Sequence, residues 1–279
     1  MTVGIVTGAA RGMGAACAAR VADLVDILLL VDRNESTLAA QADTLAAAKT
    51  RADVEPFVLD VKDGAGITRL AARVSELGPL RAVAHAAGVS PTMADWREIL
   101  TINLVGTALL VDACRALAQS GTAVVCFASV APLLALGPDG VPADAVLDDP
   151  LAADFLEKIR EAVGPDIEDP GMAYTWSKRG VHRLVRREAV AFGEVGARIC
   201  SVTPGIIDTP MGRQEGAAHA ANDLLVQLSP IKREGRAEEV AAGAAFLLSD
   251  DASFISGIDL PVDGGVMAAI RSGGGVALA

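Results

Sequence analysis

The segment TVGIVTGAARGMG, residues 2–14, decides the fold class. Residues 2–7 are mostly apolar, as is typical of a buried strand. Glycine at positions 8, 12 and 14 lets the chain turn tightly and approach a ligand, and the helix expected from Ala15 presents free N–H groups to a phosphate. A glycine-rich turn that binds nothing is disfavoured by this strand–turn–helix order. The segment therefore predicts a pyrophosphate site over Gly12, Met13 and Gly14, with Gly8 at the start of the turn.

A second apolar segment, 25–31, ends at Asp32, 18 residues beyond Gly14. A carboxylate at this place is expected to hold the ribose hydroxyls of a dinucleotide. It would repel a 2′-phosphate by roughly 4 kcal/mol per charge pair at 4 Å and an effective dielectric of 20, which favours NAD over NADP. Arg11 and Arg33 argue the other way, because either could reach a 2′-phosphate. We interpret Arg33 as lying against the adenine, and expect NAD.

Strand-like and helix-like segments alternate along the rest of the chain. Strands are expected near 54–59, 80–84, 123–128, 197–202 and 259–262, and helices near 67–76, 95–118, 174–192 and 238–248. This alternation predicts an α/β fold, a doubly wound parallel sheet of the Rossmann type with helices on both faces. No Ser/Pro-rich linker divides the 279 residues, so we expect a single domain over 1–279.

Composition narrows the classes of partner. The net charge of −11 disfavours a nucleic-acid partner, and the longest apolar run, 123–137, is too short to cross a bilayer. The four cysteines are scattered without metal-ligand spacing, which predicts no metal site and reduced thiols in a cytoplasmic protein. The chain begins directly with a strand, so no signal peptide is expected.

Ligands of such sheets lie beyond the carboxyl ends of the strands, so the residues there are candidates. Asp60 follows the third strand and could accept from an adenine amino group or cap the next helix. Small residues after the fourth strand would let the backbone approach a cofactor; these are Ala86, Ala87 and Gly88. His85 precedes them, and we interpret it as a turn residue with no clear partner.

Three polar residues follow at later elements. Asn103 falls within an apolar helix, where a buried amide needs partners; it could hold a water in a proton relay or satisfy a kinked backbone. Ser129 follows the fifth strand and could polarise a substrate carbonyl or be ordinary turn chemistry. Thr209 follows the rigid turn after the sixth strand and could bond a cofactor amide or phosphate.

Tyr174, the only tyrosine, precedes Lys178 by four residues. On a helix this spacing puts the phenol and the ammonium on one face. A free tyrosine has a pKa of roughly 10, and a neighbouring cation lowers that pKa by stabilising the phenolate. The pair could then exchange a proton with a substrate oxygen near neutral pH.

Taken in order, these residues resemble the short-chain dehydrogenase/reductase family over nearly the whole chain. The match includes Thr7-Gly8-x-x-x-Gly12-x-Gly14, Asp32, Asp60, Asn103, Ser129, Tyr174, Lys178, Pro204-Gly205 and Val262-Asp263-Gly264-Gly265. The resemblance implies an NAD(P)-dependent oxidoreductase acting on a small-molecule alcohol or ketone. It also implies positions for adenine contact at Asp60 and Val61, and for contact with the nicotinamide amide at Ile207 and Thr209.

The same resemblance implies a separate role in the reaction for each of four residues. Tyr174 would be the acid/base, and Ser129 would orient the substrate oxygen. Asn103 would hold a water of the proton relay, and Lys178 would contact the ribose and stabilise the phenolate. Two rival functions remain. One is a non-catalytic NAD(H)-sensing protein on the same fold, which the intact residue set disfavours. The other is an enzyme of different chemistry, such as an epimerase or an enoyl reductase; enoyl reductases of this fold usually have their tyrosine and lysine farther apart.

The chain departs from the family pattern in two places. His85-Ala86 stands where many members carry asparagines, so a structural side-chain bond there is expected to be lost. Ser129 and Tyr174 are 45 residues apart, farther than in most members, because of an extra segment at 137–171. The insertion is similar to one in the bacterial 3α-hydroxysteroid dehydrogenase/carbonyl reductase branch.

A helix is expected within the insertion. Asp149 and Pro150 are read as its N-cap and first residue, followed by an apolar face at Leu151, Phe155, Ile159 and Val163. The insertion could wall the substrate cleft, or lie beside the helix expected to start at Tyr174. In the second case it would block a contact common in the family, so we expect a homo-oligomer that is a dimer rather than a tetramer.

A lid and a tail complete the chain. Residues 210–230 are expected to form a substrate lid, whose apolar helical part suggests a partly hydrophobic substrate. The tail 267–279 could be disordered or reach a neighbouring subunit.

Overall fold

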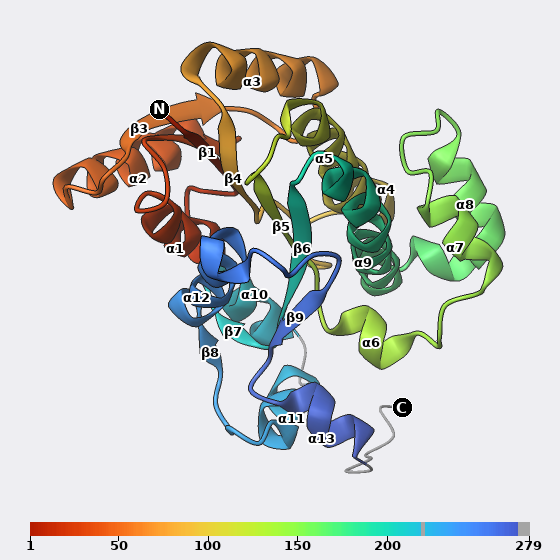
Figure 1. Cartoon of the computed structure of the whole chain (residues 1–279). Coiled ribbons are helices and arrows are strands. Elements are labelled where there is room, and N and C mark those ends of the chain that lie inside the picture. Colours follow the sequence, from red (N-terminus) through yellow and green to blue (C-terminus); the bar gives the residue numbers. More distant parts are fainter. Residues whose placement is uncertain (219–220, 273–279) are drawn as a thin grey trace.

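The computed structural model describes residues 1–218 and 221–272; positions 219–220 of the predicted lid and the tail beyond 272 lie outside the described residues. Seven strands form one parallel sheet in the order β3-β2-β1-β4-β5-β6-β9 (Figure 1). They are β1 Val3–Thr7, β2 Ile27–Asp32, β3 Asp53–Val58, β4 Leu80–His85, β5 Ala123–Phe127, β6 Arg198–Pro204 and β9 Asp259–Val262. The chain order reverses between β1 and β4, which is where such a sheet leaves a crevice at its carboxyl edge.

Helices cover both faces of the sheet. One face carries α1 Gly12–Val21, α2 Glu35–Ala47 and α12 Ala237–Leu248; the other carries α3 Gly64–Leu77, α5 Gly106–Leu117 and α9 Pro170–Glu194 (Figure 1). Neighbouring strand residues alternate between the two cores, so that Ile5 packs with the α3–α5–α9 side and Val6 with the α1–α12 side. Burial on both faces explains the unbroken apolar strands and confirms the predicted doubly wound parallel sheet.

Shorter elements complete the described chain. They are α4 Trp96–Leu100, η1 Thr101–Val105, α6 Ala131–Ala135, α7 Pro142–Leu147, α8 Phe155–Val163, η2 Pro165–Glu168, β7 Ile207–Asp208, α10 Pro210–Ala218, α11 Ala221–Leu228, β8 Gly235–Arg236, η3 Asp250–Ala252 and α13 Val266–Arg271. Two of these, β7 and β8, pair as a small parallel sheet of their own. In the segment predicted to be a lid, α10 and α11 flank the undescribed residues 219–220.

The helix expected over 95–118 is not continuous. It runs as α4, then a π-helical turn η1, then α5. By length and composition alone the run Trp96–Leu117 could cross a membrane, but 61% of its apolar window is buried inside the protein, as in a core helix. Side-chain contacts of Asn103, which sits in the π turn, accompany the interruption.

The helix predicted within the insertion begins later than expected. Asp149 and Pro150 do not start a helix: α8 begins at Phe155, and they lie in the turns after α7. Leu151 is outside the helix and 45% exposed, so the apolar face is shorter than expected and centres on the buried Phe155 and Ile159. Within the insertion, the α-helices that do start with a proline are α7, at Pro142, and α9, at Pro170.

The insertion packs against the outer side of α9 (Figure 1). The Arg179 guanidinium bonds both oxygens of Asp144, from Nε at 2.6 Å and from Nη2 at 2.8 Å, and both side chains are almost fully buried. Arg183 on the next turn holds Asp148 at 2.9 and 2.6 Å. Of the insertion, only residues 169–171 line the main cavity described below, so it lies beside α9 rather than across the cleft.

Candidate active site

One cavity of about 810 Å³ lies at the carboxyl edge of the sheet and brings together residues from six strand ends and α9. Its walls include the predicted residues Gly8, Arg11, Gly12, Met13, Gly14, Asp32, Arg33, Asp60, Val61, Ala86, Ala87, Gly88, Ser129, Tyr174, Lys178, Ile207 and Thr209. Asn103 is not part of the wall and lies behind Gly88. A Cβ on Gly88 would come within 3.1 Å of Asn103 Oδ1 and 3.7 Å of Lys178 Nζ, so only glycine fits easily between them.

The glycine turn is built for close approach to an anion. Gly12 has φ of +59°, and a Cβ on Gly14 would lie 2.0 Å from the Gly8 carbonyl oxygen. The helix α1 begins at Gly12 rather than at Ala15 as expected, and no side-chain hydrogen bond from its N-cap, Arg11, closes this end. Open N–H groups and the positive end of the helix dipole face the cavity, so the turn fits a pyrophosphate.

Backbone donors hold the carboxylate at the end of β2. Asp32 Oδ2 accepts from Ala10 N–H at 3.2 Å, and Oδ1 accepts from Asn34 N–H at 3.1 Å. Each oxygen keeps further acceptor capacity, because a carboxylate offers about four lone-pair sites. Arg11 and Arg33 line the same part of the cavity. This end therefore fits an adenosine ribose.

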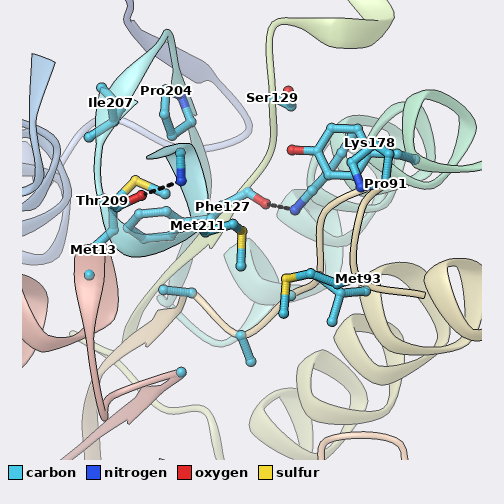
Figure 2. A pocket seen from close by; sticks show the side chains of 18 of the residues that line it. Met13, Pro91, Met93, Phe127, Ser129, Lys178, Pro204, Ile207, Thr209 and Met211 are labelled. Atoms are coloured by element: carbon cyan, nitrogen blue, oxygen red, sulfur yellow. Dashed lines mark hydrogen bonds between the residues drawn. The ribbon is translucent and has the colours of Figure 1, made fainter. Parts of the chain in front are cut away.

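Tyr174 and Lys178 come from adjacent turns of α9. The Lys178 Nζ lies 5.8 Å from the centre of the Tyr174 ring and donates a 2.8 Å hydrogen bond to the Phe127 carbonyl at the end of β5 (Figure 2). The helix begins at Pro170, one turn before Tyr174, where the start was expected. Asp169 caps it by accepting from Met172 N–H at 2.9 Å.

Ser129 lies just beyond β5, at the same end of the cavity (Figure 2). It is 8% exposed, and its Oγ accepts from Ala131 N–H at 3.2 Å. The Oγ proton is therefore available to a group in the cavity. The Ser129 carbonyl in turn contacts the buried His182 Nε2 at 3.2 Å.

The Asn103 side chain fastens three segments. Its Oδ1 accepts from Val89 N–H at 2.8 Å, and its Nδ2 donates to Val89 O at 3.0 Å and to Ser177 Oγ at 3.4 Å. Ser177 Oγ donates to Tyr174 O at 2.7 Å. The amide thus fixes the loop after β4 against α9. The backbone carbonyl remains the part of Asn103 that a relay water would use.

His85 does have partners, against the expectation for it. Its Nδ1 lies 2.7 Å from Thr7 Oγ1 and its Nε2 lies 2.9 Å from Thr107 Oγ1. The sequence did not reveal these contacts because the three residues belong to β1, β4 and α5, which only the folded sheet brings together.

The cavity also contains residues that the sequence did not reveal. They are largely apolar: Pro91, Met93 and Met211, which are labelled in Figure 2, and also Leu134 and Leu225. Asp169 adds one carboxylate, and the sequence signal for it was the Asp169-Pro170 pair, typical of an N-cap and first helical residue. Arg213, in the segment predicted to be a lid, forms an ion pair with Asp208.

In the ranges 1–218 and 221–272, no group of three or more His, Cys, Asp or Glu side chains is placed to hold a metal ion.

Two family models match the chain. The model described as short chain dehydrogenase matches residues 2–136, and one described as enoyl-(acyl carrier protein) reductase matches residues 161–267. The stretch 137–160, most of the insertion, falls between them. The two models together span the sheet and the cavity.

Curated relatives match over almost the full length. Levodione reductase of Leifsonia aquatica is 30% identical over 95% of this chain and 94% of its own. D-threitol dehydrogenase of Mycolicibacterium smegmatis is 32% identical over 94% and 92%. Cyclohexanol dehydrogenase of an Acinetobacter species is 29% identical over 94% and 93%.

A solved structure agrees with these matches. The crystal structure of levodione reductase superposes with a TM-score of 0.73 at 29% identity, covering 96% of this chain and 98% of that one. Sequence, fold and cavity point the same way: the chain belongs to the short-chain dehydrogenase/reductase family, whose members use NAD(P) to interconvert alcohol and carbonyl groups of small molecules.

Proposed function

We propose that this protein is an NAD-dependent dehydrogenase that interconverts a neutral, largely apolar secondary alcohol and its ketone, with Tyr174 as the acid/base. The observation that carries the proposal is the arrangement of one cavity. Tyr174, Lys178 and Ser129 line one part of it, and the glycine turn and Asp32 line another. A dinucleotide bound between them would bring its nicotinamide to the tyrosine.

The chain's own residues would prepare the substrate for reaction. Ser129 Oγ donates to the substrate oxygen and fixes its direction. Tyr174, as phenolate, takes the hydroxyl proton in oxidation and returns it in reduction. Lys178 favours that phenolate through its charge. NAD, when bound, supplies the hydride acceptor or donor.

Cofactor choice follows from the end of β2. The Asp32 carboxylate is held by Ala10 N–H and Asn34 N–H, so it cannot easily turn away from a 2′-phosphate. Removing its two backbone bonds would cost free energy in addition to the charge repulsion. Arg33 and Arg11 lie nearby, but their charges do not cancel the repulsion of a 2′-phosphate by a carboxylate that is fixed at the ribose position. These features support NAD as the cofactor.

The substrate class follows from the walls near Tyr174. Apolar side chains such as Met93, Leu134 and Met211 favour a hydrocarbon body. The Asp169 carboxylate disfavours an anionic substrate and could accept from a second hydroxyl. Relatives named for levodione and cyclohexanol agree with this class, whereas others are named for the polyol threitol and for an alcohol that carries a carboxylate.

Enoyl reduction is the weaker reading, although one matching model carries that description. The four-residue spacing of Tyr174 and Lys178 places them on adjacent turns of α9, whereas enoyl reductases of this fold usually space them more widely. An enoyl reductase would also need no Ser129 hydroxyl to orient an alcohol oxygen.

The quaternary state is proposed from the insertion. It covers the side of α9 that carries Arg179 and Arg183, a helix through which family members commonly associate. With this side occupied, we propose a dimer rather than a tetramer.

The direct test is the absorbance of NADH formed from NAD, and of NADPH formed from NADP, with a panel of neutral cyclic and acyclic secondary alcohols. The proposal expects turnover with at least one alcohol and a kcat/KM for NAD well above that for NADP. Turnover that requires NADP, or reduction of an enoyl thioester with none of any ketone, would contradict it.

A further inference from the structure

A buried histidine joins the glycine-turn strand to the helix behind the active site. His85 is the last residue of β4 and is 2% exposed. One ring nitrogen contacts Thr7 at the end of β1, and the other contacts Thr107 in the first turn of α5. This chain has His85-Ala86 at the turn where many members of the family carry asparagines.

The contacts continue at both ends into a chain of four hydrogen bonds. On one side, Ala87 N–H donates to Thr7 Oγ1 at 3.2 Å. On the other, Thr107 Oγ1 donates to the Asn103 carbonyl at 2.7 Å. Ala87 lines the cavity, and Asn103 lies directly behind Gly88. The chain therefore begins and ends at the cofactor side of the site.

The direction of every bond in this chain is fixed by its two ends. A backbone N–H can only donate and a carbonyl can only accept. Thr107 has one hydroxyl proton and gives it to Asn103 O, so it must accept from His85 Nε2–H. A neutral imidazole has one proton, so His85 Nδ1 is bare and accepts from the Thr7 hydroxyl.

Burial reinforces this assignment. The pKa of His85 is lowered to about 3, mainly by loss of solvation and further by the charge of Lys178. The ring is therefore neutral throughout the working pH range, as the bond directions require. The chain also cannot carry a proton along its length, because Ala87 N–H cannot accept one and Asn103 O cannot donate one.

We propose that His85 is a positioning residue that, as the Nε2–H tautomer, braces the Asn103 carbonyl through Thr107 and the 86–88 turn through Thr7. The brace rests on the proposed function, in which Asn103 and the 86–88 turn face the cofactor and the proton relay. Because the carbonyl direction depends on a hydroxyl one turn away, loss of that hydroxyl disturbs the relay without touching Tyr174, Lys178 or Ser129.

Thr107 offers a matched pair of variants. Thr107→Val keeps the shape and removes the hydroxyl, so His85 Nε2–H loses its acceptor and Asn103 O loses its donor. Thr107→Ser keeps the hydroxyl and removes only a methyl group. Thermal unfolding of both variants shows whether each is folded before its kinetics are compared.

The expected kinetic result is a fall in kcat of about 10-fold or more for Thr107→Val, with the KM for NAD within about 2-fold of the parent value and Thr107→Ser close to the parent. The plot of kcat against pH should also shift for the valine variant alone. A folded valine variant with parental kcat and pH profile, or a serine variant as impaired as valine, would overturn the brace.

A second measurement does not depend on turnover. Long-range ¹H–¹⁵N spectra distinguish a bare ring nitrogen from a protonated one, and the chain has only three histidines, so assignment is tractable. His85 should show a bare Nδ1 and a protonated Nε2, unchanged from about pH 5 to about pH 9. A protonated Nδ1, or titration in this range, overturns the proposal even if the enzyme is active. Failure of the parent protein to turn over any alcohol would count against the proposed function and leave this result intact.

Discussion

The ammonium of Lys178 lies one turn of α9 beyond Tyr174, 5.8 Å from the centre of its ring, and is held at 2.8 Å by the Phe127 carbonyl. The carbonyl ends β5, so the position of the cation is set by the sheet as well as by its own helix. A cation fixed at this distance favours the phenolate without a flexible side chain having to be ordered during reaction. The pair is thus prepared for proton exchange before any substrate binds.

Replacing the carboxylate at the end of β2 should change cofactor choice. In Asp32→Ser the repulsion of a 2′-phosphate is gone, while Arg11 and Arg33 remain to attract it. The ratio of kcat/KM for NADP to that for NAD should rise by about 10-fold or more. Asp23→Ser, which removes an exposed acid near the other end of α1, is the matched control and should leave the ratio unchanged. Equal ratios in all three proteins would mean that Asp32 does not select the cofactor.

Removing the charge of Asp169 should relax selection against anionic substrates. Asparagine keeps the helix cap, because its side-chain oxygen can still accept from Met172 N–H. We expect Asp169→Asn to raise kcat/KM for a carboxylate-bearing alcohol by about 5-fold relative to its neutral analogue. Asp166→Asn, an exposed acid of η2 that does not line the cavity, is the control. No change in the relative rates would remove Asp169 from the substrate site.

The ion pair of the insertion should make stability depend on acid pH. The Arg179 guanidinium lowers the pKa of Asp144 to about 2, further aided by Gly140 N–H and opposed by burial. A carboxyl whose pKa is lower in the folded state adds stability above its unfolded pKa of about 3.9, and that stability is lost as pH falls towards 2. Asp144→Asn should therefore be destabilised by about 3 kcal/mol at pH 7.

The difference in unfolding free energy between the two proteins should then narrow as pH falls below about 4, where the unfolded carboxyl takes up a proton, and should be smallest near pH 2, where the native carboxyl is also protonated. Denaturant unfolding of both proteins at pH 7 and at successively lower pH measures this difference in unfolding free energy. Asp166→Asn should show no such convergence. A gap that stays constant with pH would show that the charge of Asp144 is not what stabilises the insertion.

The covered side of α9 predicts the mass in solution. Light scattering should give twice the chain mass of 28.4 kDa. A tetramer would need a second contact between chains through α9, and α7, with Asp144 bonded to Arg179, already occupies that side of the helix. A species of four chains at the same concentration would show that the insertion does not block association.

Local sequence signals predicted the parts of the fold that are set locally. The glycine turn, the apolar strands and the Tyr174/Lys178 pair depend on near neighbours, and each lies where it was expected, although α1 and α9 begin a few residues earlier. The first turn of α9 was recognisable only from Asp169 and Pro170, which sequence reasoning had placed in the insertion.

Contacts between distant residues account for what the sequence did not reveal. The π turn at 101–105 accompanies bonds from Asn103 to Val89 and Ser177, 14 and 74 residues away. The anchor of the insertion joins Asp144 to Arg179, 35 residues apart. His85 finds partners 78 and 22 residues away. No regular spacing along the sequence predicts any of these contacts, because the residues come together only when the chain folds.

The most direct test of the account compares Tyr174→Phe with the parent protein in two assays. NADH binding, followed by its fluorescence, should be nearly unchanged, because the ring and the glycine turn remain. Turnover of an alcohol that the parent oxidises should fall by about 100-fold or more, since the phenol oxygen that takes the proton is gone. Normal binding with lost turnover is the predicted result; a phenylalanine variant that retains parental turnover would contradict the role of Tyr174 as the acid/base.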